Sequence, residues 1–175
     1  MSGAFYRRLA VGTALLAAGA VAAWYQAPSG PGAGRGGLSA EPAAALVQRV
    51  VDGDTVVLAG GERVRYIGVD TPELHHPRKP VEPYAREAKE FNRQLVAGKR
   101  VRLELDVQKR DRYGRLLAYV YLEDGTFVNS ELLRQGYAQL LTIPPNVQHA
   151  DLFVQMQKEA REAGRGLWQE WKDAE

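Results

Sequence analysis

Three carboxylates stand close to the ends of predicted strands, and they are the residues of this sequence best suited to chemistry. Asp54 lies in the turn of residues 52–55, and Asp70 and Glu73 lie where a later apolar run breaks into a loop. An Asp-Gly pair is by itself an ordinary turn, so neither loop would be a site alone. Brought together on a rigid barrel, these side chains offer the oxygen ligands that a hard cation such as calcium prefers.

Two arginines could bind a phosphate beside such a cation. Arg65 lies on the predicted strand that leads to Asp70, and Arg115 ends the turn of residues 111–115. A planar guanidinium matches the oxygens of a phosphate with a two-pronged fork. A surface ion pair is the commoner role of any one arginine, but two forks beside a cation form a clamp suited to a phosphodiester.

Composition limits the other kinds of site. The chain has no cysteine and only three histidines, so disulfides and thiolate metal sites are excluded. From Leu46 onward the 20 basic residues are balanced by 20 acidic ones, so net charge does not indicate a nucleic-acid partner. A local patch does: residues 99–115 contain seven basic and three acidic side chains, although such a run is often only a solvated face.

The first 45 residues differ in composition from the rest. Arg7 and Arg8 precede an uncharged run of 17 residues, 9–25, which is typical of an export signal. A retained membrane tether through residues 9–25 stays open as the alternative, because the run reaches the short limit of a membrane span. We expect an exported protein: secreted, periplasmic, or membrane-anchored and facing outward.

Proline, glycine and alanine dominate residues 26–45, which favours a linker. We therefore divide the chain into a signal peptide or anchor at 1–25, a linker at 26–45 and a folded domain at 46–175.

Within that domain, β-rich and alternating runs predict strands, and apolar residues spaced by three and four predict helices. The predicted strands are 46–51, 55–59, 63–69, 101–107 and 116–122, with a short extended piece at 126–128. A helix is predicted at 84–96, a short one capped by Asn129 or Ser130 and ended by Gly136, and a C-terminal one with Phe153, Met156 and Ala160 on one face. This order predicts an α+β fold that is mainly β: a five-stranded OB-type barrel with about three helices.

These segments together resemble the staphylococcal-nuclease-like (thermonuclease) family, over about residues 46–168. The likeness rests on motifs that fall in family order at matching spacing. They are Asp52-Gly53-Asp54-Thr55, Arg65, Val69-Asp70-Thr71-Pro72-Glu73, His76-Pro77-Arg78-Lys79, Tyr113-Gly114-Arg115, Arg134-Gln135-Gly136 and Gly166-Leu167-Trp168.

The resemblance implies an OB-type barrel with a single calcium ion. Its ligands would be Asp54, Asp70 and the main-chain carbonyl of Thr71. The catalytic residues would be Arg65, Glu73 and Arg115, with Glu73 as general base or as the residue that orients the attacking water. The reaction would cut single- and double-stranded DNA and RNA and leave 3′-phosphorylated ends.

Further residues would contact the substrate. Arg78, Lys79 and Arg112 would hold flanking phosphates. Tyr113 would either hydrogen-bond near the phosphate or pack as a half-buried ring. Two aromatic residues that flank the nucleotide in the family prototype fall by alignment on Thr142 and Pro144, so base stacking departs from the family pattern at this point.

Two rival interpretations remain beside a calcium-dependent endonuclease. One is a non-catalytic nucleic-acid-binding module on the same barrel; such modules lose the carboxylates and arginines that this chain retains. The other is a divalent-metal site of His75, His76 and His149, although adjacent histidines in a proline-rich loop seldom ligate one ion together. We expect the protein to be a monomer.

Overall fold

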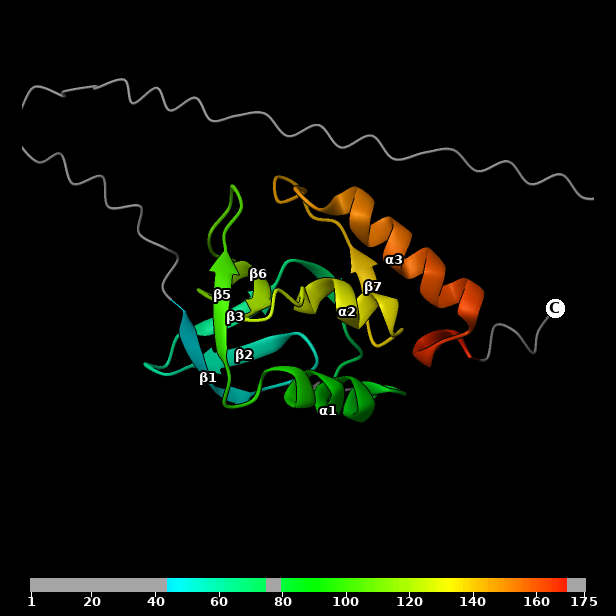
Figure 1. The fold of residues 1–175 in the computed structure, drawn as a ribbon, viewed down its shortest axis with the longest axis horizontal. Coiled ribbons are helices and arrows are strands. Elements are labelled where there is room, and N and C mark those ends of the chain that lie inside the picture. The colour runs from blue at the N-terminus through cyan, green and yellow to red at the C-terminus, as the bar shows by residue number, and fades with distance from the viewer. Residues whose placement is uncertain (1–43, 75–79, 170–175) are drawn as a thin grey trace, which may run out of the picture. The chain divides into compact units, whose positions relative to one another are not determined.

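Five strands form a closed barrel in the computed structural model, which describes residues 44–74 and 80–169 (Figure 1). Around the barrel the order is β1-β2-β3-β6-β5, and β5 pairs with β1 to close it. Only β3 and β6 pair in parallel; the other neighbours are antiparallel. The predicted OB-type barrel is confirmed. The strands are β1 (Ala45–Val50), β2 (Thr55–Leu58), β3 (Arg63–Tyr66), β5 (Arg100–Glu104) and β6 (Leu116–Leu122).

A second, two-stranded sheet was not predicted. The run expected as one strand over 63–69 divides, because the chain turns at Gly68, whose φ is 81°. The short strand β4 (Gly68–Asp70) then pairs with β7 (Gln139–Leu141) instead of continuing in the barrel. A Cβ at Gly68 would lie 2.3 Å from the ring of Phe153, so only glycine fits there. This break places Asp70 in the second sheet, opposite Gln139.

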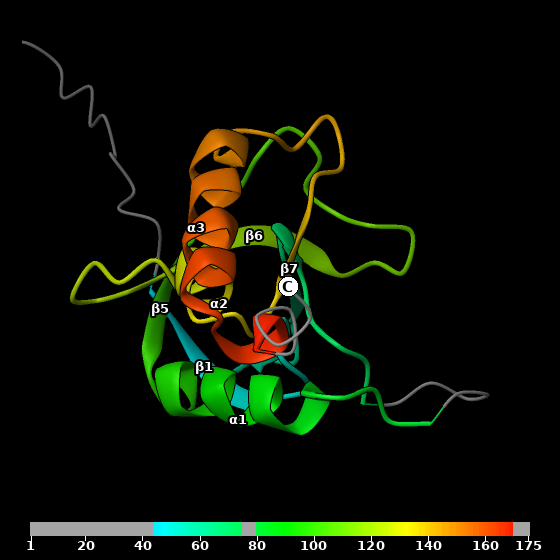
Figure 2. The ribbon, with the colours of Figure 1, turned by 90° about the vertical axis from the view of Figure 1, so that its right-hand side faces the viewer.

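Three α-helices and a short 3-10 helix complete the domain. They are α1 (Ala85–Val96), α2 (Val128–Arg134), α3 (Ala150–Ala163) and η1 (Gly166–Trp168). Figures 1 and 2 both show α2 between α1 and α3, and α2 contacts both. The amphipathic spacing of the sequence explains α1, whose buried face includes Ala85, Ala88 and Val96.

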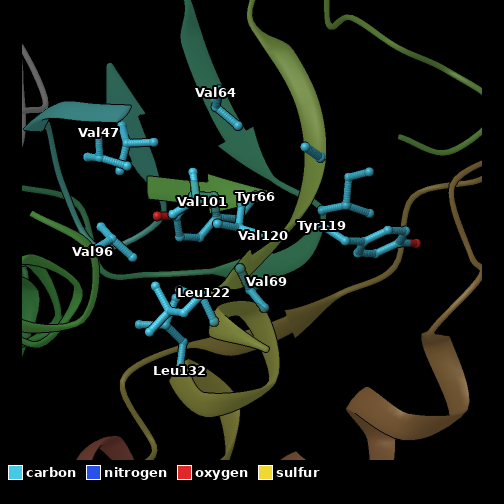
Figure 3. Close-up of a cluster of buried hydrophobic side chains, with 14 of the residues drawn as sticks. Val47, Val64, Tyr66, Val69, Val96, Val101, Tyr119, Val120, Leu122 and Leu132 are labelled. Carbon is cyan, nitrogen blue, oxygen red and sulfur yellow. The ribbon is translucent and has the colours of Figure 1, made fainter. Parts of the chain in front are cut away.

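The core fills the barrel and the space beneath α2 and α3. Valines alternate inward from the strands and surround the fully buried ring of Tyr66, as the close-up shows (Figure 3). Leu132 of α2 and Phe153 of α3 close this core from the helical side. A strand framework packed in this way holds its ends rigidly, which is what a site built on strand ends requires.

Two local predictions were wrong. Residues 126–128 form no strand, only a single bridge between Tyr121 and Phe127, and α2 begins at Val128. Asn129 therefore lies inside α2 and is no cap. Its buried amide instead accepts a hydrogen bond from Val120 N–H at 2.9 Å and donates to the carbonyl of Ile67 at 2.8 Å. Tertiary hydrogen bonds gave this asparagine a different role from the one its local sequence indicated.

The alternating run at 101–107 also ends early. Strand β5 stops at Glu104, and Leu105 and Val107 beyond it are 39% and 71% exposed. The apolar alternation continues to Val107, but the pairing of β5 with β6 ends at Glu104.

Candidate active site

Two loops, residues 52–55 and 70–73, meet at the buried carboxylate of Asp54. Thr71 donates to Asp54 Oδ2 twice, from its main-chain N–H and from its Oγ1, both at 3.0 Å. Thr55 Oγ1 donates to the other oxygen, Oδ1, at 3.0 Å. The loops touch so closely that a Cβ at Gly53 would lie 2.7 Å from the Thr71 side chain. The far-separated segments that sequence analysis singled out are therefore one structural unit.

Arg65 of β3 lies between the carboxylates of Asp54 and Asp70. Its Nη1 is 2.9 Å from Asp54 Oδ2, and its Nη2 is 2.7 Å from Asp70 Oδ1. The same Nη1 also donates to the main-chain carbonyls of Tyr66 and Val69 at 3.2 and 2.7 Å. Contacts to these four oxygens fix the orientation of a side chain that is only 13% exposed.

The donor set at this edge fits a hard cation. Across the residues that the structure describes, no group of three or more His, Cys, Asp or Glu could enclose a metal. Asp54 Oδ2 and Asp70 Oδ1 nevertheless converge on one positive group, Arg65, and Asp70 is half-exposed to water. Two carboxylates, the Thr71 carbonyl and waters match the irregular, oxygen-only coordination that calcium accepts. A bound cation would compete with Arg65 for these oxygens.

Asp52 adds a fourth carboxyl group, which the predicted site did not include. Burial, and next the neighbouring charge of Asp54, raise the pKa of Asp52 to about 6. Burial also raises the pKa of Asp70. The charges of Asp54 and Glu82 raise this pKa further, and the charge of Arg65 lowers it. Burial is the larger cause of both shifts, and the charge of Asp54 contributes to each. The signal in the sequence was only that Asp52 lies two residues before Asp54.

Asp111 organises the turn that presents Arg115. Its Oδ1 accepts the main-chain N–H groups of Tyr113 and Arg115 at 2.9 and 3.0 Å, and its Oδ2 accepts Arg115 Nε at 2.6 Å. Gly114, with φ 78°, completes the turn. Burial opposes ionisation of Asp111, but the hydrogen bonds and charge of Arg115 keep the pKa of this carboxyl below its usual value. Asp111 is a supporting residue that sequence analysis did not name.

One cavity of about 520 Å³ joins the two arginines. Arg65 and Arg115, the two arginines predicted to hold a phosphate, both line it. Apolar side chains line another part of the wall, including Val69, Leu117 and Leu141. A cavity with cationic and apolar walls suits a phosphate that carries an organic group.

Arg112 and Tyr113 stand at the rim of this cavity. Arg112 Nη2 donates to the Tyr113 hydroxyl at 2.7 Å, and its guanidinium carbon lies 4.8 Å from the ring centroid. Tyr113 is 68% exposed, so it is not a half-buried packing residue. Its open position beside Arg115 leaves it available to a substrate. Arg78 and Lys79, the other predicted phosphate contacts, lie outside the described residues.

Glu73 stays close to the predicted metal ligands but does not line the cavity. Its side chain is exposed, and its main chain is bonded to Glu82, as described below. Of the three histidines proposed as a rival metal site, His75 and His76 lie outside the described residues. His149 contacts Tyr121 and Glu104 through Nε2, at 3.3 and 3.4 Å.

Part of the cavity wall is aliphatic. Leu141 and Ile143 line the cavity, whereas Thr142 borders a separate small cavity with Tyr119 and Phe153. Alternation along β7 and the residues after it explains this, because neighbouring side chains point to opposite faces. Of the residues after β7, Leu141 and Ile143 thus line this cavity, whereas the alignment predicts Thr142 and Pro144 as the positions that flank a nucleotide.

The predicted membrane tether at 9–25 also falls outside the described residues. Within 44–74 and 80–169, none of the helices combines the length and the apolar character needed to cross a membrane.

Comparison with known proteins gives consistent results. Residues 63–170 match the family model described as staphylococcal nuclease homologue. A thermonuclease of Staphylococcus intermedius is 45% identical over 127 residues, which cover 71% of this chain and 75% of the relative. A thermonuclease of Staphylococcus hyicus is 38% identical over 147 residues, covering 82% and 86%. The endonuclease YncB of Bacillus subtilis is 40% identical over 127 residues, covering 70% and 60%.

Proposed function

This chain belongs to the staphylococcal nuclease family and is a nuclease, and from that premise we propose that it hydrolyses DNA and RNA with calcium and leaves 3′-phosphorylated ends. One observation supports the proposal above others. Arg65 touches both candidate calcium ligands, Asp54 and Asp70, and also lines the cavity that Arg115 faces. We call Asp54, Asp70 and Thr71 the cation edge, and the cavity lined by Arg65 and Arg115 the phosphate cavity. Arg65 belongs to the second and contacts the first, so the two adjoin.

Asp54, Asp70 and the carbonyl of Thr71 would hold the calcium. When bound, the ion would neutralise charge on the phosphate and lower the pKa of a water nearby. Thr71 fixes Asp54 through two hydrogen bonds, and Thr55 fixes its second oxygen. Because these hydrogen bonds engage both oxygens of the Asp54 carboxylate, they fix its orientation beside Asp70.

Arg65 and Arg115 would bind the scissile phosphate from different elements, β3 and the 111–115 turn. Their guanidinium groups would stabilise the charge that develops on the phosphate oxygens in the transition state. Arg115 is set by Asp111 before any substrate arrives, so little reorganisation is needed at the moment of reaction. One of the two arginines would also stabilise the departing 5′-oxygen, which leaves the phosphate on the 3′ side.

Glu73 would accept a proton from the attacking water or orient that water toward phosphorus. Its exposed carboxylate, two residues after Thr71, supports this role, since a general base must reach the water directly. Arg112, together with Arg78 and Lys79, would hold the phosphates on either side of the scissile bond, and this part of the affinity would weaken as salt rises.

The test is cleavage of single-stranded DNA and RNA by the purified protein with calcium, with magnesium, and with a calcium chelator. We expect activity in calcium and little in magnesium, because magnesium demands near-octahedral coordination and dehydrates reluctantly. The ends are assigned by treating products with a 3′-phosphatase before polymerase extension. Full activity in magnesium with a calcium-specific chelator present would contradict the calcium assignment.

We also propose that the protein acts outside the cytoplasm, as a monomer. Arg7, Arg8 and the uncharged run at 9–25 support export, and a nuclease of low specificity is hazardous beside its own genome. Cell fractionation and size-exclusion chromatography test the two statements. Full-length chain found free in the cytoplasm would contradict the first, and a dimer at micromolar concentration the second.

A further inference from the structure

Glu82 holds the main chain of Glu73 at two points. Glu73 N–H donates to Glu82 Oε2 at 3.1 Å, and Glu82 N–H donates to the Glu73 carbonyl at 3.2 Å. These bonds join residues nine positions apart. They act on the backbone of Glu73 while its carboxylate stays exposed.

Glu82 is in turn fixed to the barrel through α1. Its carbonyl accepts the N–H of Ala85, the first residue of α1, at 3.2 Å, and Ala85 is fully buried. Further along α1, the buried Asn92 donates to the carbonyl of Asp52 at 3.1 Å and accepts the Tyr66 hydroxyl at 3.0 Å. The position of Glu82 is therefore set by the same framework that sets the 52–55 loop.

On its other side Glu73 follows two restricted residues. Thr71 is bound to Asp54 by two hydrogen bonds. Pro72 has a fixed φ and no N–H to donate. Glu73 is thus held from the Asp54 side through Thr71 and from the α1 side through Glu82. Without the second anchor, the chain after Pro72 would be free to rotate, and the carboxylate of Glu73 with it.

We propose that Glu82 is a positioning residue that places Glu73 for the reaction, an inference that rests on the role assigned to Glu73 in the proposed function. Two properties of Glu82 can be separated. Its carboxylate oxygen accepts a hydrogen bond, and its negative charge adds to the field at Asp70. Glutamine at position 82 keeps an acceptor oxygen and removes the charge, so it tests which property matters.

The experiment compares Glu82→Ala, Glu82→Gln and the control Glu87→Ala in the full-length protein, at saturating calcium. Glu87 is an exposed glutamate in the first turn of α1, so its loss removes the same charge close by. We expect Glu82→Ala to lower kcat on single-stranded DNA about tenfold with KM changed less than about twofold, because small misplacement of a catalytic group is costly. The kcat of Glu82→Gln should stay within about threefold of the wild-type value, and the kcat of Glu87→Ala should equal the wild-type value.

A second measurement does not depend on activity. Hydrogen exchange at the Glu73 amide should be at least about tenfold faster in Glu82→Ala than in wild type, and unchanged in Glu82→Gln and Glu87→Ala. If Glu82→Ala does not fold, Glu82→Met, of similar length and without an acceptor oxygen, replaces it. Wild-type kcat and exchange in the variant without an acceptor would overturn the proposal. Equal loss of kcat in the Gln variant would also overturn it, since charge would then be the cause.

Glu73→Gln, measured in parallel, separates this inference from the proposed function. If Glu73→Gln keeps full activity, the role of Glu73 fails, whatever Glu82 does. If Glu73→Gln loses activity while Glu82→Ala keeps it, the role of Glu73 stands and the positioning role of Glu82 is rejected.

Discussion

The buried part of the cation edge is held by hydrogen bonds, whereas the outer wall of the cavity, formed by Tyr113, Leu141 and Ile143, is exposed. At the edge, Asp54 is 5% exposed and is held by hydrogen bonds from two loops. Around the cavity, Tyr113 and Ile143 are 68% and 59% exposed; Tyr113 lies between β5 and β6, and Ile143 between β7 and α3. Asp54 and Arg115 are held by protein hydrogen bonds before substrate arrives, whereas the side chains that would meet the rest of the nucleotide are exposed. Rigid placement favours rate, and open placement favours tolerance of sequence.

The largest effect is expected when Arg65 or Arg115 is replaced by a residue of the same charge. Arg65→Lys and Arg115→Lys should each lower turnover by about 10²–10³, the usual cost of losing one preorganised donor to a developing charge. Lysine cannot make the two-pronged contact. Arg93→Lys, on an exposed arginine paired with Glu90, is the control and should leave turnover unchanged. Wild-type turnover in either site variant would make that arginine an ordinary surface charge.

The contact between the two loops at the edge can be broken by one methyl group. In Gly53→Ala the new Cβ would meet the buried Thr71 side chain and force the loops apart. We expect the free energy of unfolding to fall by about 1–3 kcal/mol and turnover to fall by up to about 10²-fold. Gly60→Ala is the control: it is strained by its φ of 109° but meets nothing within 4 Å. It should lose stability and keep turnover, as measured by denaturant unfolding and steady-state kinetics.

At the exposed wall we expect a substitution to raise affinity for a nucleotide. Ile143→Tyr should bind a nucleoside bisphosphate about tenfold more tightly in calcium, because stacking a base on a ring contributes about 1–3 kcal/mol. Thr142→Tyr is the matched control, since Thr142 borders a different cavity, and it should give no gain. Calorimetry decides the matter. A gain at 142 but not at 143 would show that the bound nucleotide does not lie against the Leu141–Ile143 wall.

The smallest expected effect concerns Asp111, which holds Arg115 in the 111–115 turn. Asp111→Asn keeps an acceptor for the turn but loses the charge that pairs with Arg115, so turnover should fall several-fold. Because the pKa of Asp111 is lowered in the folded protein, its ionised form stabilises the fold above about pH 4 and this contribution is lost as pH falls further. Acid unfolding of wild type should therefore be steeper below about pH 4 than that of the variant. Identical acid profiles would show that the pair adds nothing to stability.

Much of the barrel could be predicted from the sequence because its signals are local. The continuous apolar and β-prone run at 116–122 predicts a buried strand, and helical spacing in 85–96 reflects burial of one helix face. The β4–β7 sheet could not be predicted in this way. Its strands are three residues each, and they pair only because Gly68 turns the chain toward Phe153 and residue 139 returns beside it.

For the site, the sequence by itself determined which groups are present: two arginines, the carboxylates of Asp54, Asp70 and Glu73, and a motif order that matches one family. It determined this because chemistry depends on residue type. Only the tertiary structure decided that Arg65 lies between Asp54 and Asp70, that Asp111 sets Arg115, and that Leu141 and Ile143 face the cavity. Those facts depend on register and on contacts between distant segments, and a shift of one residue in a strand reverses which side chains face a site.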